Sequence, residues 1–288
     1  MIIKSVKNPM LPINWNTAIR YASLVKIAAS VSPSGSYDQS EITQIKTADY
    51  TFLQTLYGDD LATDIDPHLG DVVSFGFLAI SDAKELVAVI RGTDTILEWL
   101  HDASFLMVPS PIDGAHGFTE DGFTAVYRSL RVRSAKDTLP AKDSIKGYLD
   151  AGDATSVTVC GHSLGGALAT LLTLDVGLNT SCHAPTAYTY ASPRTGDHIF
   201  AGAYNAAIPS SYRIANRQDL VPKLPPILPL PYEHVNTQYE LSPPPNKINQ
   251  TIPCMHHLTT YLWMMGQLAG TSAYPLDSDC TAVGLAHI

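Results

Sequence analysis

The sequence predicts an α/β fold, with a mostly parallel central sheet and helices on both of its faces. In the second half of the chain, β-rich segments at 156–160, 186–191 and 211–215 alternate with helix-forming segments at 167–178 and 198–207. Such an alternation is typical of a parallel sheet that helices cover on both sides. With 45% hydrophobic and only 16% charged residues, the chain can bury one large core. Because no internal repeat or long linker divides it, we expect a single domain that spans all 288 residues.

The remaining elements follow from local patterns. The β-rich runs 73–81 and 85–90 are separated by a turn of a length typical of a hairpin. The segment 221–245 is rich in proline, and we expect a structured surface excursion there. Apolar residues at helical spacing and runs of good helix formers predict further helices, which are expected at 16–29, around 50–56, and at 122–134, 141–149 and 258–268.

The charge and the hydropathy of the chain exclude several partners. A formal net charge of −9 argues against nucleic acid and against electrostatic docking on anionic lipid, so any contact with a membrane would be apolar. Residues 1–9 lack the continuous apolar core of a signal peptide, and nowhere do about 18 apolar residues run together to form a transmembrane segment. We therefore expect a soluble chain that is either intracellular or already processed.

The cysteines do not form a recognisable framework. Four of them, Cys160, Cys182, Cys254 and Cys280, are too few and too scattered for a disulfide scaffold or for a zinc site with C-x-x-C spacing. Cys160 lies in a predicted strand and is most simply a small core residue. One bridge between Cys254 and Cys280 is compatible with the sequence, which leaves it open.

The clearest chemical signal is a pentapeptide of the form G-x-S-x-G, Gly161-His162-Ser163-Leu164-Gly165. In a nucleophile elbow, a serine occupies a sharp strand-to-helix turn with strained dihedral angles, so the residues two before and two after it must be small. Both of those positions are glycine here, and a predicted strand and helix flank the turn. Ser163 is therefore the candidate nucleophile. The helix that follows directs its unpaired N–H groups, that of Leu164 among them, at a developing oxyanion.

An activated serine needs a histidine base and an acid that orients the histidine, and in this arrangement both follow the serine along the chain. Asp175 lies inside the predicted helix after the elbow, and Asp197 stands where a helix cap is expected. Asp219 follows the strand at 211–215 through a short turn, so it stands at the carboxyl end of a strand. It is the candidate acid.

Four histidines follow Asp219. His287 is next to the last residue, and His234 lies in the proline-rich excursion. His256 and His257 stand directly before the final helix, from which a loop can reach the carboxyl edge of the sheet. These two are the candidate bases.

Several further segments occur in an order that is known from one family. They are VIRGT at 89–93 with Trp99 and Asp102; GF at 122–123 with Tyr127; GHSLGG at 161–166; TYASPRTGD at 189–197 with Phe200; RIAN at 213–216 with DLVP at 219–222 and LPP at 224–226; and YEHV at 232–235. These segments are spread over residues 79–262, about two thirds of the chain, and in them the chain resembles the class 3 lipases, which include filamentous fungal triacylglycerol lipases and feruloyl esterases. The resemblance implies an α/β-hydrolase fold with a short lid.

The resemblance also implies roles for individual residues. Ser163 matches the nucleophile and Asp219 the acid, while Thr93 matches a residue whose backbone N–H and hydroxyl form the oxyanion hole together with the N–H of Leu164. Family members with a His-x-Leu-x-x-Tyr pattern select His256 as the base, with Leu258 and Tyr261 in register. The fungal His-x-x-Tyr spacing, read with a one-residue gap, selects His257 instead. We take His256 as the base and keep His257 as the alternative.

This chain departs from the family at two places. Members often have His-x-Gly-Phe before the third helix, whereas here Glu120 precedes Gly122-Phe123 and His116 lies upstream. We therefore expect His116 to be a surface loop residue. The amino-terminal cysteines that form bridges in fungal members are absent, so their disulfide pattern does not carry over.

The segment 94–108 carries several large apolar residues beside the predicted oxyanion donor. In fungal relatives the matching segment is a short amphipathic helix that covers the site. We expect residues 94–100 to form such a lid, with Trp99 near its hinge. The alternative is that the residues after Asp102 form a core strand and that the lid is too short to close the site.

Together these residues predict a lipase or carboxylesterase that hydrolyses acylglycerol-type esters through an acyl-enzyme. Ser163 attacks, His256 transfers the proton and Asp219 orients His256; neither a cofactor nor a metal is needed. The expected partners are the ester substrate and, transiently, an oil–water interface. A feruloyl, short-chain or phospholipid esterase is the alternative within enzymes, and a catalytically idle binding or signalling protein is the alternative outside them. Secretion is compatible with the resemblance.

Overall fold

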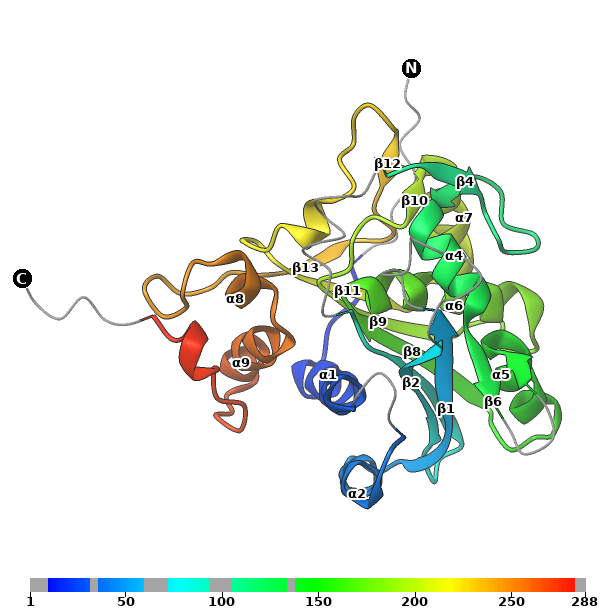
Figure 1. Ribbon diagram of the computed structural model, residues 1–288, viewed down its shortest axis with the longest axis horizontal. Coiled ribbons are helices and arrows are strands. Elements are labelled where there is room, and N and C mark those ends of the chain that lie inside the picture. The colour runs from blue at the N-terminus through cyan, green and yellow to red at the C-terminus, as the bar shows by residue number, and fades with distance from the viewer. Residues whose placement is uncertain (1–9, 32–35, 60–71, 94–104, 134–137, 283–288) are drawn as a thin grey trace, which may run out of the picture.

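The structure is a computed structural model that describes residues 10–31, 36–59, 72–93, 105–133 and 138–282 (Figure 1). Within these residues, nine strands form one sheet in the order β13-β11-β9-β8-β3-β2-β1-β6-β7. The strands are β1 Thr51–Asp59, β2 Val72–Ile80, β3 Glu85–Ile90, β6 Arg131–Arg133, β7 Thr138–Pro140, β8 Ser156–His162, β9 Thr186–Tyr190, β11 Ser211–Asn216 and β13 Gln238–Leu241.

The centre of the sheet is parallel, as the sequence predicts. From β3 through β8, β9 and β11 to β13, each strand pairs in parallel with the next. The other half is antiparallel and includes the predicted hairpin, in which β2 and β3 pair through a short turn. The carboxyl ends of the parallel strands therefore meet at one edge, where α/β proteins commonly place their ligands.

Helices cover both faces of the sheet. Figure 1 shows α1, α2 and α9 on one side of it, with α4, α5 and α6 on the other. None of the helices in the described part of the chain has the length and apolarity that crossing a bilayer requires. Their bounds are α1 Trp15–Ser30, α2 Gln39–Thr47, α4 Asp121–Ser129, α5 Ala141–Asp150, α6 Leu164–Asn179, α7 His198–Ala207, α8 Ile252–His256 and α9 Leu258–Ala269.

Two apolar cores result, one on each face, and β3 contributes to both. Because successive side chains of a strand point to opposite faces, Val87 and Val89 pack with α1 and α9, whereas Leu86, Ala88 and Ile90 pack with α4 and α6. All five side chains are fully buried. This explains why β3 is a continuous apolar run in the sequence rather than an alternating one.

Glu85, at the start of β3, joins α1 and the residue before β1 to the centre of the sheet. Its carboxylate accepts hydrogen bonds from Tyr21 of α1 at 2.5 Å, from Tyr50 before β1 at 2.6 Å and from Thr158 of β8 at 2.6 Å. Three hydroxyl donors satisfy a partly buried acid. The network lies at the end of β3 opposite to the strand's carboxyl end, so it supports the scaffold rather than the edge where ligands are expected.

The prediction of a helix around 50–56 is wrong. That segment is β1, which pairs antiparallel with β2 along its length and with β6 on its other side. The predicted helix at 122–134 is shorter than expected, because α4 ends at Ser129 and β6 follows. The other predicted helices and the strands at 156–160, 186–191 and 211–215 are confirmed to within a few residues.

The proline-rich excursion is structured, as predicted, and it adds a strand to the sheet. It contains a 3-10 turn at Val221–Lys223, the short strand β12 (Tyr232–Glu233) and β13. The last of these pairs in parallel with β11 and forms one edge of the main sheet. The sequence pattern does not predict β13.

A small second sheet, in the order β12-β10-β5-β4, lies near one end of the molecule (Figure 1). Two of its strands are β5 (Phe118–Glu120) and β10 (Gly196–Asp197). The fourth, β4 (Met107–Pro109), is part of the segment predicted as a lid; it is only half-buried, so it is not the core strand of the alternative interpretation. Residues 94–100, the predicted lid helix with Trp99, lie outside the described residues.

Candidate active site

Ser163 lies on a sharp turn between β8 and α6. Its backbone has φ 58° and ψ −127°, a conformation that costs free energy in a residue with a side chain. A Cβ atom added at Gly161 would stand 2.0 Å from the carbonyl oxygen of Gly165, and one at Gly165 would stand 2.4 Å from the carbonyl oxygen of Arg91. Side chains at these two positions would therefore clash with the backbone, which is why the pentapeptide needs both glycines.

His256 lies between Ser163 and Asp219. Its Nε2 is 2.8 Å from the hydroxyl oxygen of Ser163, and its Nδ1 is 2.9 Å from Oδ2 of Asp219. Because the carboxylate only accepts, Nδ1 donates and the neutral ring keeps Nε2 free to accept the serine proton. The residues His256, Ser163 and Asp219 are 5%, 1% and 0% exposed, respectively. This is the geometry of a serine nucleophile, a general base and an acid that orients the base.

Asp219 is held by two further donors. The backbone N–H of Val221 donates to Oδ1 at 3.0 Å, and the hydroxyl of Tyr261 donates to Oδ2 at 2.7 Å. Tyr261 in turn accepts a hydrogen bond from the backbone N–H of Asn216 at 2.9 Å. Burial, together with the charge of Asp219, raises the pKa of Tyr261 well above its usual value, so the hydroxyl remains a donor. The sequence identified Tyr261 only as a position in a pattern, not as a partner of the acid.

The segment that carries His256 is anchored on both sides. The side-chain amide of Asn216 donates to the carbonyl oxygen of Met255 at 2.9 Å, and the N-cap hydroxyl of Thr251 accepts from the backbone N–H of Cys254. Cys254 and Cys280 form a disulfide, the bridge that the sequence left open. The short helix α8 is thereby tied to the end of β11 and to the C-terminal part of the chain.

His162, the residue before Ser163, also supports His256. Its Nε2 donates to the carbonyl oxygen of His256 at 2.8 Å, and the two rings lie 4.8 Å apart between centroids. Burial lowers the pKa of His162 well below its usual range, so this ring is neutral and places no positive charge beside His256. The sequence does not indicate this contact, although His162 stands within the elbow.

The other candidate histidines lie elsewhere. His257 is half exposed, and its Nδ1 is 3.8 Å from Oδ2 of Asp277. His234 donates from Nε2 to the carbonyl oxygen of Pro222 at 2.5 Å. His287 lies outside the described residues. Of the histidines that the structure describes, it is His256 that contacts Ser163.

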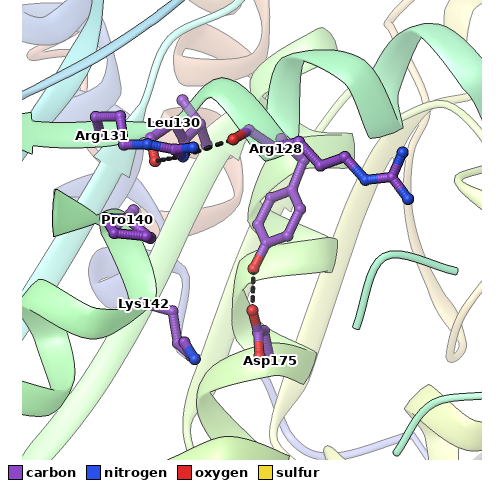
Figure 2. A pocket seen from close by; sticks show the side chains of 8 residues that line it. Arg128, Leu130, Arg131, Pro140, Lys142 and Asp175 are labelled. Atoms are coloured by element: carbon purple, nitrogen blue, oxygen red, sulfur yellow. Dashed lines mark hydrogen bonds between the residues drawn. The ribbon is translucent and has the colours of Figure 1, made fainter. Parts of the chain in front are cut away.

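The other candidate acids have structural partners. Asp197 caps α7, because its Oδ1 accepts from the backbone N–H of Phe200 at 2.8 Å. Asp175 accepts from the hydroxyl of Tyr127 at 2.5 Å, at the wall of a separate cavity of about 150 Å³ that Lys142 also lines (Figure 2). Neither carboxylate has a hydrogen bond to His256, whereas that of Asp219 accepts from Nδ1 of this ring.

The two predicted oxyanion donors flank Ser163. Leu164 is the first residue of α6 and fully buried. On the other side, a Cβ at Gly92 would stand 3.0 Å from Cβ of Ser163, so the turn that leads to Thr93 passes directly beside the nucleophile. Arg91 fixes this turn by donating to the carbonyl oxygens of Ser74 at 2.7 Å and of Gly92 at 3.0 Å.

A cavity of about 330 Å³ opens beside these groups. Thr93, His162 and His256 form part of its wall, so the cavity reaches His256, whose ring contacts Ser163. The rest of its lining comes from α1, from the turn after β3, from the segment around α8 and from the segment after α9, namely Lys26, Ala29, Gly92, Pro253, His257, Leu258, Thr259 and Asp277.

Proteins of one known family resemble this chain in sequence. The family model described as lipase (class 3) matches residues 87–228, a range that includes Ser163 and Asp219. A phospholipase A1-II 7 of Oryza sativa subsp. indica is 32% identical over 229 residues, which are 68% of this chain and 55% of the relative. The chain belongs to the class 3 lipase family. It spans about half the length of the curated relatives that it matches.

Solved structures give the same fold for this class 3 lipase. A deletion mutant of the Rhizomucor miehei lipase propeptide complex is similar over 80% of this chain and 67% of that one, with a TM-score of 0.61 and 23% identity. A mutant form of MDLA from Penicillium cyclopium is similar over 80% and 79%, with a TM-score of 0.57 and 25% identity. The predicted α/β-hydrolase fold is confirmed.

In this chain, Glu120 stands where members of the family often have a histidine before the third helix. Glu120 caps α4 there, because its Oε2 accepts from the backbone N–H of Phe123 at 2.7 Å. Burial raises the pKa of Glu120 to about 7. His116 is exposed, as expected. The matched range 87–228 ends before His256, so the choice of base rests on the geometry alone.

Proposed function

We propose that this class 3 lipase is a serine ester hydrolase that cleaves acyl esters of glycerolipids. The observation that carries the proposal is the buried relay from Ser163 through His256 to Asp219, with hydrogen bonds of 2.8 and 2.9 Å. Its curated relatives are phospholipases A1 and its structural neighbours are lipases, which supports a lipid ester as the substrate. The triad, the oxyanion donors and water supply every group that the proposed reaction uses.

The reaction proceeds in two halves. Nε2 of His256 accepts the proton of Ser163 as the serine oxygen attacks the ester carbonyl, and Asp219 stabilises the imidazolium that forms. The N–H of Leu164 and Thr93 donate to the oxyanion of the tetrahedral intermediate. When the intermediate collapses, the carbon–oxygen bond to the alcohol breaks and His256 passes its proton to that oxygen. Water, deprotonated by His256, then releases the acyl group from Ser163 as a carboxylic acid.

We also propose that the enzyme contacts an oil–water interface transiently. Leu220 follows the acid Asp219 and is 42% exposed, while Ile227 and Leu228 in the same excursion are 60% and 75% exposed. Apolar side chains at the surface support docking on neutral lipid, whereas the net charge of −9 opposes docking on anionic lipid. Leu228→Asp is expected to lower hydrolysis of emulsified tributyrin and to leave hydrolysis of dissolved p-nitrophenyl butyrate unchanged. Equal rates of the variant and the wild type on the emulsion would contradict the contact.

The decisive test of the proposed activity is Ser163→Ala, assayed on p-nitrophenyl esters together with labelling by a fluorophosphonate. In the variant, kcat is expected to fall about 10⁶-fold, because the nucleophile acts as one unit with its base. Labelling by the fluorophosphonate is expected to disappear. A variant that kept most of the esterase activity would exclude Ser163. A wild-type chain that neither hydrolysed esters nor reacted with the fluorophosphonate would favour an idle binding protein.

A further inference from the structure

The position of His256 determines where the alcohol part of the substrate lies. In the proposed reaction, Nε2 of His256 protonates the leaving oxygen, so the alcohol must leave on the side of Ser163 that faces this ring. The cavity of about 330 Å³ opens on that side, since His256 and His257 line it together with Thr93. Its volume is at the lower end of the range of roughly 300–1,000 Å³ that small ligands occupy. It is therefore the place for the glycerol part and whatever the glycerol carries.

The ionisable groups that line this cavity differ in whether they have hydrogen-bond or ion-pair partners. Asp277 accepts a hydrogen bond from the hydroxyl of Thr259 at 2.5 Å and faces His257 at 3.8 Å. His162 is kept neutral by burial. Lys26, on the exposed side of α1, has neither an ion pair nor a side-chain hydrogen bond to any other residue that the structure describes. Its ammonium group is thus available to a ligand in the cavity.

A triacylglycerol or a diacylglycerol offers such a cation no anionic group, because its alcohol part is uncharged. In a glycerophospholipid, the alcohol that leaves carries a phosphodiester, and a lysine ammonium binds phosphate as a point charge with three donors. The net charge of −9 means that the protein as a whole does not attract this anion. A preference for it must therefore come from a local group.

We propose that Lys26 is a specificity-determining residue that binds the phosphate of a glycerophospholipid while Ser163 attacks one of its acyl esters. The inference rests on the proposed ester hydrolysis and names the substrate class of the same site. The reaction is unchanged: one ester bond is cleaved by water, the acyl group leaves as a carboxylic acid, and the lysophospholipid alcohol takes the proton from His256. Lys26 lowers the free energy of the bound phospholipid and takes no part in bond breaking.

The test compares Lys26→Met and Lys26→Glu with the wild type on substrates that are dissolved as monomers, which separates recognition of the head group from binding to a surface. Dihexanoyl phosphatidylglycerol below its critical micelle concentration is the charged substrate, and p-nitrophenyl butyrate is the neutral one. Lys46→Glu is the control, because it makes the same change in net charge at an exposed residue of α2 that does not line the cavity. Equal rates of fluorophosphonate labelling verify that each variant keeps its triad.

With Lys26→Met, kcat/KM for the phospholipid is expected to fall about tenfold, which corresponds to the free energy of one hydrogen bond to a charged group. With Lys26→Glu it is expected to fall further. Hydrolysis of p-nitrophenyl butyrate is expected to stay within about twofold in both. Salt should slow phospholipid hydrolysis by the wild type more than by Lys26→Met, because screening weakens an exposed ion pair.

Four results would overturn the inference. An equal loss with Lys46→Glu would assign the effect to net charge, and an equal loss on both substrates would assign Lys26 a structural role. A wild-type enzyme that cleaves p-nitrophenyl butyrate but not the phospholipid would exclude the substrate class and leave the proposed esterase activity standing. If the wild type cleaved neither ester, and Ser163→Ala behaved identically, the proposed function itself would fail and the role of Lys26 with it.

Discussion

Tyr261 and His256 donate to the same oxygen of Asp219. The hydroxyl of Tyr261 lies 2.7 Å from Oδ2, and Nδ1 of His256 lies 2.9 Å from the same atom. Tyr261 belongs to α9 and Asp219 follows β11, so this bond joins the last helix to the carboxyl edge of the sheet. Because Val221 holds the other oxygen, the carboxylate has one orientation, and that orientation directs the ring of His256 at Ser163.

Tyr261→Phe should reduce catalysis without abolishing it. The change removes one hydrogen bond to a charged acceptor and leaves the buried N–H of Asn216 without its acceptor. We expect kcat/KM for p-nitrophenyl butyrate to fall about tenfold and the free energy of unfolding to fall by about 1–3 kcal/mol. Tyr239→Phe is the control, because its hydroxyl also donates one hydrogen bond, to the carbonyl oxygen of Leu11, away from the triad. Unchanged kcat/KM in Tyr261→Phe would show that Asp219 needs no third donor.

The two adjacent histidines should differ sharply. His256→Ala removes the base and is expected to lower kcat by about 10⁶, as the loss of a triad histidine does in subtilisin. His257→Ala is expected to lower the rate on p-nitrophenyl butyrate by less than about tenfold, because His257 lines the cavity and does not contact Ser163. Steady-state kinetics of both variants, with circular dichroism to verify folding, decide the matter. The opposite ranking would favour the fungal spacing over the geometry.

Thr93 can be tested through its hydroxyl. Thr93→Val keeps the shape and the backbone N–H but removes one donor from the oxyanion hole, so we expect kcat to fall about 10²-fold with little change in KM. Thr93→Ser retains the hydroxyl and should recover most of the activity. If the valine and serine variants were equally active, only the backbone of residue 93 would contribute.

Most of the site could be predicted because short sequence patterns identify its residues. The elbow requires Gly161 and Gly165 at two positions before and after Ser163, so one pentapeptide contains all three. Asp219 stands shortly after the end of a strand. The choice between His256 and His257 could not be made in the same way, because neighbouring residues differ only in the direction of their side chains. The contacts of Tyr261 and His162 join residues that are far apart along the chain.

The fold was predictable where local and long-range preferences agree. α6, α7 and β8 show strong local patterns and were found. The prediction for β1 failed because burial is irregular along this strand. Its structure comes from pairing with β2 and β6, which a local sequence pattern does not contain. β13 is short and lies among prolines; it becomes a strand because β11 offers it a free edge.

Glu120 should make the stability of the protein depend on pH near neutrality. Burial raises its pKa from the usual 4.5 to about 7, so the fold favours the protonated form. The stabilisation is fully present below pH 4.5 and is lost as the pH rises towards 7, at up to roughly 1.4 kcal/mol per pH unit. Glu120→Gln keeps an acceptor for the N–H of Phe123 but does not titrate. In urea denaturation, the wild type should therefore lose stability relative to this variant between pH 4.5 and 7; parallel pH curves would contradict the assignment.

The Cys254–Cys280 disulfide should stabilise both the fold and the position of His256. Cys254 lies in α8, two residues before His256, and the bridge closes a loop over a sequence separation of 26. Replacing both cysteines with serine is expected to lower the free energy of unfolding by about 2–4 kcal/mol. It should also lower kcat, because α8 then loses its covalent link to the C-terminal part of the chain and depends on hydrogen bonds such as those of Asn216 and His162. Cys182→Ser, which removes a free cysteine away from the site, should change neither quantity. A reducing agent should destabilise the wild type and leave the double variant unaffected; equal sensitivity of the two proteins would show that the bridge does not contribute.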